Sequence, residues 1–200
     1  MTRSPWARGY ARTPEAYIWG TAPSAFARKV SALLPRGARV LELGCGEGRE
    51  CVFFASRGLD VTGIEISSAG LRKAARLARE RGVEVRWVQG DMAQPTVHGR
   101  FDLVYSCGSI HYVRRRERAR FFAHLRGLTR PRGYHAHVVF TNRLIYVEQA
   151  EVVEYFVPGE IARAYDGWLI REDVHRSIKC AEDGMPHRHS VEQLVVQRIA

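Results

Sequence analysis

The sequence predicts an α/β fold with a doubly wound, mainly parallel sheet of seven strands. Short apolar runs that read as buried strands alternate with amphipathic segments of helical period, which is the order of βαβ units. Near the C-terminus the pattern changes, because two β-like runs follow each other with little helix between them. Such runs pair antiparallel, so we expect an antiparallel hairpin at the C-terminal edge of the sheet.

Each expected element is set by its apolar positions and by the turn residues at its ends. The expected helices are 23–34, 47–57, 69–81, 116–128 and a short one at 160–165. The expected strands are 39–43, 60–66, 84–89, 101–106, 134–140, 168–180 and 189–199. Ser24 and Ser67 are candidate N-caps. Pro131-Arg132-Gly133 reads as a turn before the fifth strand.

Two local expectations concern the first half of the chain. In the helix at 69–81, Leu71, Ala74 and Ala78 fall on the inner face, and Lys73 falls on the face toward water. Residues 1–12 carry charges and glycine but no apolar run, so we expect a loose arm and no signal peptide there.

The composition is that of a globular protein, since 46% of the 200 residues are hydrophobic. This length suits one domain with a real core, and no apolar run approaches the roughly 18 residues of a membrane span. The four cysteines form neither a C-x-x-C pair nor a zinc pattern, so we expect reduced thiols. We therefore expect a cytoplasmic protein without membrane contact, acting as a monomer or homodimer.

The formal net charge is +10, and only three of the 31 basic residues are lysines. One interpretation is a surface for nucleic acid or other anions, and the other is a GC-rich coding sequence that favours arginine codons. The arginines are scattered rather than massed, which favours the second interpretation. We therefore do not expect a nucleic-acid partner, although the overall field favours an anionic small substrate.

The most informative stretch is the glycine-rich turn that follows the first expected strand. It has the spacing Gly44-x-Gly46-x-Gly48 and leads into a helix. Glycines let the backbone approach a small molecule, and a helix N-terminus offers free N–H groups. Glu65 ends the next strand about twenty residues on, at the interval expected for a carboxylate that binds a ribose. Together these features indicate a nucleoside cofactor.

The turn departs from the dinucleotide fingerprint G-x-G-x-x-G, because position 49 is arginine. Glu42 also precedes the first glycine. A carboxylate at that place would repel a pyrophosphate but attract an amino group. S-adenosylmethionine has an amino group, a carboxylate and a ribose but no phosphate, so the pattern favours this cofactor.

Four motifs in order resemble those of the class I S-adenosylmethionine-dependent methyltransferases. They are Glu42-Leu43-Gly44-Cys45-Gly46-Glu47-Gly48, Gly63-Ile64-Glu65-Ile66-Ser67, Gln89-Gly90-Asp91-Met92 and Phe101-Asp102-Leu103-Val104-Tyr105-Ser106. The resemblance covers about residues 20–140 and implies a Rossmann-like sheet. It also implies a single methyltransferase domain over 1–200, with an N-terminal arm or lid (1–22), a cofactor-binding core (23–140) and a substrate-side part (141–200).

A narrower resemblance is to the small methyltransferases of the tellurite-resistance type, which lie near the thiopurine S-methyltransferases. It is carried by Tyr17-Ile18-Trp19-Gly20 with Pro23-Ser24, and by Pro186-His187-Arg188-His189. Members of that group act on chalcogen oxyanions, thiols or unassigned small molecules. The resemblance therefore leaves the acceptor open.

The motif match and simple chemistry together assign the cofactor contacts. The backbone of Gly44, Cys45 and Gly46 is expected against the methionine part. Glu42 is expected near the amino group, and Glu65 at both ribose hydroxyls. The remaining expected contacts are Ile66 on the adenine face, Asp91 at the adenine amino group, Met92 over the ring, Ser106 at the methionine amino group and Trp19 near the sulfonium.

The acceptor side is expected beyond the C-terminal ends of the strands. Cys107, His111 and Tyr112 follow the fourth strand, and Arg143 follows the fifth. His111 is the candidate general base and Tyr112 a second catalytic candidate. Further substrate contacts are expected from Tyr17, His187 and His189. We expect no metal, because the spacing of His175, Cys180, His187 and His189 is not a zinc signature.

Three functions stay open on the sequence. The leading one is in-line transfer of the methyl group from S-adenosylmethionine to a small thiol, chalcogen oxyanion or O/N nucleophile. A nucleic-acid methyltransferase is the alternative that the charge suggests, although no Asn-Pro-Pro-Tyr-like tetrapeptide follows the fourth strand. The third is a protein of this fold that binds the cofactor without transferring the methyl group.

Overall fold

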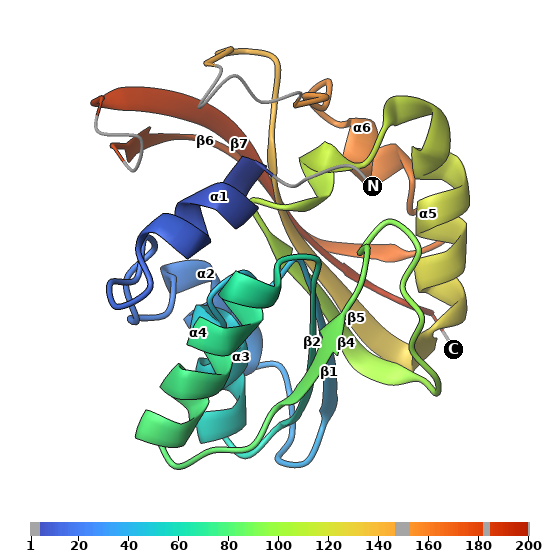
Figure 1. Ribbon diagram of the computed structural model, residues 1–200. Helices are drawn as coiled ribbons and strands as arrows, with labels where there is room; N and C mark the ends of the chain where they lie inside the picture. The colour runs from blue at the N-terminus through green and yellow to red at the C-terminus, as the bar shows by residue number, and fades with distance from the viewer. Residues whose placement is uncertain (1–4, 147–152, 182–184, 200) are drawn as a thin grey trace. The chain divides into compact units, whose positions relative to one another are not determined.

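The computed structural model describes residues 5–146, 153–181 and 185–199. It divides into two compact units, residues 1–97 and 98–200. The strands run in the order β3-β2-β1-β4-β5-β7-β6, which confirms the predicted seven-stranded sheet with a parallel majority and an antiparallel edge. Figure 1 shows these strands and the helices with their labels.

The described residues of the first unit form three parallel strands and four helices. The strands are β1 (Arg39–Leu43), β2 (Asp60–Glu65) and β3 (Arg86–Gln89). The helices are α1 (Pro5–Arg12), α2 (Ala25–Ser31), α3 (Arg49–Ser56) and α4 (Ser68–Glu80). Helices α3 and α4 lie side by side next to these strands (Figure 1). The parallel register brings the C-terminal ends of β1 and β2 to the same edge, because Leu43 pairs with Ile64.

Both predicted N-caps of this unit are confirmed. The Ser24 side chain accepts a hydrogen bond from the backbone N–H of Ala27 at 3.0 Å. The Ser67 side chain accepts one from Gly70 at 3.2 Å. Each bond satisfies a backbone donor that has no partner within the first turn of its helix. The caps thus fix where α2 and α4 begin.

Two expectations for this unit were wrong. The expected loose arm contains the helix α1, whose Trp6 and Tyr10 are buried, while residues 1–4 lie outside the described part. Lys73 is buried on α4 rather than exposed to water, and it forms an ion pair with the buried Glu47. Both corrections have one cause, since the buried face of α4 packs against the N-terminal helix as well as against the sheet.

The second unit holds the other four strands. They are β4 (Phe101–Cys107), β5 (Thr129–Phe140), β6 (Leu169–Cys180) and β7 (His187–Gln197). Strands β4 and β5 are parallel, whereas β7 runs antiparallel between β5 and the edge strand β6. The helical segments are the 3₁₀ turn η1 (Ile110–Tyr112), α5 (Arg115–Gly127) and α6 (Glu160–Arg163). None of the described helices is both long and apolar enough to cross a membrane.

Strand β5 begins five residues earlier than expected. The predicted turn at 131–133 lies within the strand, where the register against β4 shifts between Phe101 and Leu103. Arg132 takes a left-handed backbone conformation there, with φ of 63°. Extra residues in one strand of a pair are the pattern of a bulge, so the turn signal in the sequence marked an irregularity in the strand rather than its end.

Candidate functional site

The glycine-rich turn connects β1 to α3 with its backbone in a conformation that suits glycine. Gly46 has φ of 55° and Gly48 has φ of 82°. A Cβ atom on Gly46 would lie 2.7 Å from the hydroxyl of Tyr10, and one on Gly48 would lie 2.6 Å from the Cβ of Ala74. Both the conformation and the close packing therefore exclude a side chain at these positions.

Glu65, at the end of β2, holds this turn in place. Its carboxylate accepts hydrogen bonds from the backbone N–H of Gly46 at 3.0 Å and of Ser67 at 2.8 Å, one on each oxygen. Burial raises the pKa of Glu65, against the lowering effect of these N–H donors. Since each carboxylate oxygen has two lone pairs, capacity remains for two more donors such as the hydroxyls of a diol.

Glu42 lies on β1, and Leu43 separates it from Gly44, the first glycine of the turn. Its side chain is 3% exposed, and burial, reinforced by the charge of Glu50, raises its pKa to about 8. Within the described part of the chain, its Oε2 atom is buried and has no hydrogen-bond partner. A buried carboxyl oxygen in that condition is expected to find a donor when a ligand binds, and a cationic amino group supplies one.

Ile66, Asp91 and Met92 follow the C-terminal ends of β2 and β3. The two ends are joined by the backbone N–H of Gly90, which donates to the carbonyl of Glu65 at 3.1 Å. Ile66 is 39% exposed, an unusual state for a large aliphatic residue next to a buried strand. The Asp91 side chain caps the following turn by accepting from the N–H of Ala93 at 2.8 Å.

The N-terminal aromatic residues gather at the glycine-rich turn. The Trp19 indole donates to the Tyr10 hydroxyl at 3.3 Å, and the Trp6 and Trp19 rings lie 4.7 Å apart. Burial, together with the negative charge of Glu65, raises the pKa of Tyr10 above its usual range. Tyr17 is tied to α4, because its hydroxyl donates to the carbonyl of Lys73 at 3.3 Å. Of these side chains, Tyr10 lies directly against the turn, next to Gly46.

Two residues of this region were missed by the sequence reasoning. Glu47, inside the turn, accepts from the backbone N–H groups of Ile18 and Trp19 at 3.2 Å each and pairs with Lys73. The sequence analysis used Arg49 only as a departure from the dinucleotide-binding fingerprint. In the structure its guanidinium donates to the carbonyl of Trp19 at 3.0 Å. The motif placed Glu47 between two glycines, but no feature of the sequence indicated partners so far away along the chain.

In the second unit, Ser106 at the end of β4 belongs to a buried chain of hydrogen bonds. Its Oγ lies 2.7 Å from His137 Nδ1, and His137 Nε2 lies 2.7 Å from the Tyr165 hydroxyl. The same hydroxyl lies 2.7 Å from His135 Nδ1, and His135 Nε2 lies 2.6 Å from Thr129 Oγ1. Burial lowers the pKa of His137 to about 3 and that of His135 well below its usual value, so both rings are neutral.

His111 lies in η1 and is completely buried. Its ring stacks on Phe140 at 4.3 Å and lies 4.6 Å from the Tyr112 ring. Burial lowers its pKa to about 3. Among the described residues neither of its ring nitrogens has a hydrogen-bond partner. A neutral imidazole in this state has both an N–H donor and a lone pair available to a ligand.

The other expected substrate residues of this unit differ in exposure. Cys107, at the end of β4, is half-buried, and Arg143 after β5 is exposed. His189 is buried on β7, and His187 is half-buried two residues before it. The four cysteines are free thiols, as the sequence predicts.

Comparison with known proteins places the glycine-rich turn within a recognised domain. Residues 40–133 match the family model described as "Methyltransferase domain". The magnesium-protoporphyrin O-methyltransferase of Rhodobacter capsulatus is 37% identical over 52% of this chain and 45% of its own. The ribosomal RNA small subunit methyltransferase C of Alcanivorax borkumensis is 29% identical over 77% of this chain and 38% of its own. The chain thus spans less than half the length of these two curated relatives.

The fold has clear neighbours among solved structures. TehB from Haemophilus influenzae superposes with a TM-score of 0.79, covering 90% of this chain and 63% of that one, at 16% sequence identity. At this identity the likeness bears on the fold alone. The order and direction of the seven strands are therefore those of a known architecture.

Proposed function

The chain carries a class I S-adenosylmethionine-dependent methyltransferase domain, and from this premise we propose that the protein transfers a methyl group from S-adenosylmethionine to a small-molecule acceptor. The observation that carries the proposal is the pair of buried carboxyl groups beside the glycine-rich turn, Glu65 and Glu42. We place this activity in the cytoplasm, where the four free thiols stay reduced. The protein acts there as a monomer or homodimer.

The residues present fit the cofactor. Glu65 keeps the lone pairs that a ribose diol needs, and the Oε2 atom of Glu42 has no partner among the described residues. Gly44, Cys45 and Gly46 bring the backbone next to both groups. Ile66 and Met92 supply apolar surface for adenine, Asp91 an acceptor for its amino group and Ser106 a hydroxyl for the methionine end.

When bound, S-adenosylmethionine supplies a methyl group already activated by its sulfonium. The protein's task is then to align the reactants and exclude water, and alignment can supply roughly 7–11 kcal/mol of the barrier. Tyr10, Tyr17 and Trp19 are proposed as the lid, since the Tyr10 hydroxyl lies against Gly46 and accepts from the Trp19 indole. An aromatic face near a sulfonium is favoured by cation–π attraction.

On the acceptor side, we assign His111 to form a hydrogen bond with the nucleophile. Its two buried ring nitrogens without partners among the described residues support this role. A pKa held near 3 by burial makes the free imidazole a weak base, so a thiolate or oxyanion acceptor, which needs no base, suits the site better than an alcohol. Tyr112, Cys107 and Arg143 are proposed to contact the acceptor.

The nucleic-acid alternative rests on two observations. The net charge is +10, and one relative acts on ribosomal RNA according to its name. A gel shift on RNA or DNA that weakens steeply with salt would favour it. If the protein binds the cofactor but methylates neither nucleic acid nor any member of a thiol, chalcogen and phenol panel, the proposed transfer is wrong and only cofactor binding stands.

The ribose assignment is tested by calorimetry with S-adenosylhomocysteine. We expect Glu65→Ala to weaken binding at least tenfold, because the variant loses the acceptors for a diol and for the N–H groups of Gly46 and Ser67. Asp60→Ala, at the exposed start of the same strand, is the matched control and should bind like the wild type. Equal affinity in the Glu65 and Asp60 variants would remove Glu65 from the site.

The role of His111 is tested by turnover with labelled S-adenosylmethionine once an acceptor has been found. His111→Ala should lower turnover at least tenfold and leave cofactor affinity unchanged, since the ring belongs to the acceptor side. The exposed His124 on α5 provides the control His124→Ala, which should keep wild-type turnover. Wild-type turnover in His111→Ala would exclude this assignment.

A further inference from the structure

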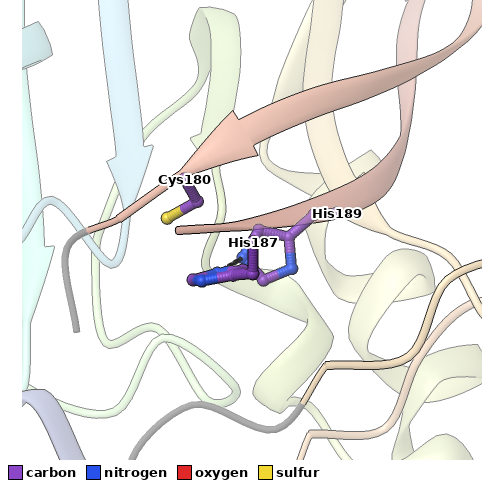
Figure 2. A group of neighbouring side chains, drawn as sticks. All are labelled: Cys180, His187 and His189. Carbon is purple, nitrogen blue, oxygen red and sulfur yellow. Dashed lines mark hydrogen bonds between the residues drawn. The ribbon is translucent and has the colours of Figure 1, made fainter. Parts of the chain in front are cut away.

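The hairpin of β6 and β7 brings together the side chains of Cys180, His187 and His189, whose spacing in the sequence matches no metal-binding motif. Across the antiparallel pair, Cys180 lies opposite His187, and Ile178 lies opposite His189. Residues two apart on a strand share a face, so His187 and His189 point to the same side of the hairpin as Cys180. Figure 2 shows the thiol and the two imidazole rings gathered where β6 ends and β7 begins.

The three side chains are close enough to share one ion. One ligand atom from each lies within 4.8 Å of the other two, and the Nε2 atoms of His187 and His189 are 2.8 Å apart (Figure 2). Tetrahedral zinc binds imidazole nitrogen at about 2.0–2.1 Å, which places two such nitrogens about 3.4 Å apart. Small rotations of the rings are sufficient to open this distance.

The ring of His187 already presents the correct nitrogen. Its Nδ1 lies 2.6 Å from the carbonyl of Met185, and a carbonyl only accepts, so Nδ1 carries the hydrogen and Nε2 has the lone pair. A ligating histidine is usually held in this way, by a bond from its other nitrogen to a carbonyl or carboxylate. The arrangement resembles the outer shell of a metal site.

Aromatic contacts hold both rings. Tyr146 stacks on His187 at 3.7 Å with an interplanar angle of 6°, and Phe140 stacks on His189 at 4.1 Å with an angle of 13°. His189 is buried, whereas Cys180 and His187 are half-buried. The cluster is thus fixed on one side and reachable from solvent on the other, which an ion needs for entry.

We propose that Cys180, His187 and His189 bind a divalent transition-metal ion, with Zn²⁺ as the ion best suited to one thiolate and two imidazoles. When the metal binds, the thiol releases its proton to solvent, and the hydrogen by which His189 Nε2 bonds to His187 Nε2 moves to His189 Nδ1. Three protein ligands leave the fourth position of a tetrahedral ion open to water or another small ligand. The metal site does not depend on the protein transferring a methyl group.

A second group of candidate ligands lies on the opposite face of the same hairpin. Asp173, His175 and Glu192 also have ligand atoms within 4.8 Å of one another. This group has no thiol, and Glu192 already accepts from the backbone N–H of Gly159 at 2.7 Å. It therefore serves as the competitor that the experiment must distinguish.

The test is metal binding by the full chain under reducing conditions after chelation and desalting. We expect one equivalent of Zn²⁺ in competition with a chromophoric chelator. We also expect Co²⁺ to give a thiolate-to-cobalt charge-transfer band together with the intense visible bands of a tetrahedral site. Cys180→Ser and His187→Gln should each lower the affinity more than tenfold. His175→Gln and Cys107→Ser, which remove a ring and a thiol elsewhere, should leave it within about threefold.

Two outcomes would overturn the proposal. One is Zn²⁺ affinity that is unchanged in Cys180→Ser and His187→Gln, and the other is affinity that is lost in His175→Gln. Thermal unfolding of the metal-free variants shows whether they fold, which is expected because both altered side chains are half-buried. If either variant unfolds, the wild-type Co²⁺ spectrum decides, since the lack of a thiolate charge-transfer band excludes Cys180 as a ligand.

Discussion

Glu42 and Glu65 are both buried carboxyl groups beside one glycine-rich turn, yet their surroundings differ. Glu65 receives two backbone N–H donors that favour its ionised form, while the Oε2 atom of Glu42 has no partner among the described residues. The pKa of about 8 therefore leaves Glu42 mostly protonated at neutral pH when no ligand is bound. A cation placed beside it would favour the ionised form and lower that pKa.

This difference predicts proton release when the cofactor binds. At about pH 7 the free protein holds the proton on Glu42, and an adjacent amino group with a positive charge should expel it. Calorimetry in two buffers with different ionisation enthalpies measures the release as a difference in heat. Glu42→Gln, which cannot ionise, should abolish the difference and weaken binding. Equal heats in both buffers for the wild type would contradict the assignment of Glu42.

For single residues, the sequence was informative where the interval between two motifs indicated the position of a side chain. The position of Glu65 beside the glycine-rich turn was predictable, because a carboxylate at the end of the second strand is expected about twenty residues after the glycines; its contact with a ribose stays a prediction. The buried state of Lys73 was not, because its helix carries charges on several sides and its partner Glu47 lies on a different element. Pairing across the fold depends on packing that the period of one helix does not contain.

Among the elements, helix α4 is joined to the glycine-rich turn by one buried ion pair, and the lysine of this pair also contacts the N-terminal part of the chain. Lys73 on α4 pairs with Glu47 of the turn, and its ammonium also donates to Thr13 at 3.3 Å. The ammonium further lies 5.8 Å from the Tyr10 ring and 5.6 Å from the Tyr17 ring. This lysine thus connects three parts of the first unit.

Removing the ammonium should destabilise the protein strongly. We expect Lys73→Met to lower the free energy of unfolding by about 3–5 kcal/mol, because the Glu47 carboxylate is left buried without its partner. Urea denaturation measures the loss, and the double variant Lys73→Met with Glu47→Gln should recover part of it. Lys29→Met on the exposed face of α2 is the control and should change stability by less than about 0.5 kcal/mol. A loss below about 1 kcal/mol in Lys73→Met would show that the pair contributes little.

Elements were predictable where an apolar run was long enough to set its own type. The strands 39–43 and 60–66 were located to within a residue, since their side chains are almost all buried. Helix α1 was missed because its burial depends on two aromatic side chains, Trp6 and Tyr10, among charges. The sequence led us to expect no metal at Cys180, His187 and His189 for a related reason, because the antiparallel register that places Cys180 opposite His187 is not apparent from their spacing along the chain.

For the molecule as a whole, stability must depend on pH through the buried histidines. His135 and His137 are neutral in the folded protein because burial lowers their pKa, whereas in the unfolded chain they titrate near the ordinary value of 6.5. Below about pH 6.5 the unfolded chain therefore binds more protons than the folded one. Their contribution to stability is full above this pH and is lost as the pH falls toward their lowered folded-state pKa values.

The His137 contribution can be isolated by comparison with His137→Gln. Each neutral buried histidine should add up to about 1.4 kcal/mol per pH unit to the slope of the unfolding free energy below about pH 6.5. We expect the difference between wild type and variant, measured in urea, to shrink as the pH falls from about 7 to about 5. His124→Gln, on the exposed side of α5, should show no such trend. A constant difference for His137→Gln would mean that its ring is not neutral in the folded state.

The buried chain from Thr129 to Ser106 has one further consequence, which follows from the direction of its hydrogen bonds. Thr129 gives its only hydroxyl hydrogen to the carbonyl of Leu125, at 2.8 Å, so it must accept from His135. That fixes the His135 tautomer, and each later link is fixed in turn: Tyr165 donates to His135, His137 donates to Tyr165, and Ser106 donates to His137.

A backbone carbonyl in the last turn of α5 thus fixes the direction of every hydrogen bond in the chain, as far as Ser106 near the end of β4. Ser106 reaches that end with its hydrogen already committed, so its oxygen has only lone pairs to offer. An ammonium or an N–H group placed there would be accepted, and a carboxylate or carbonyl oxygen would be repelled. The carbonyl of Leu125 therefore determines that a group placed at Ser106 must be a hydrogen-bond donor, although this carbonyl need not touch that group.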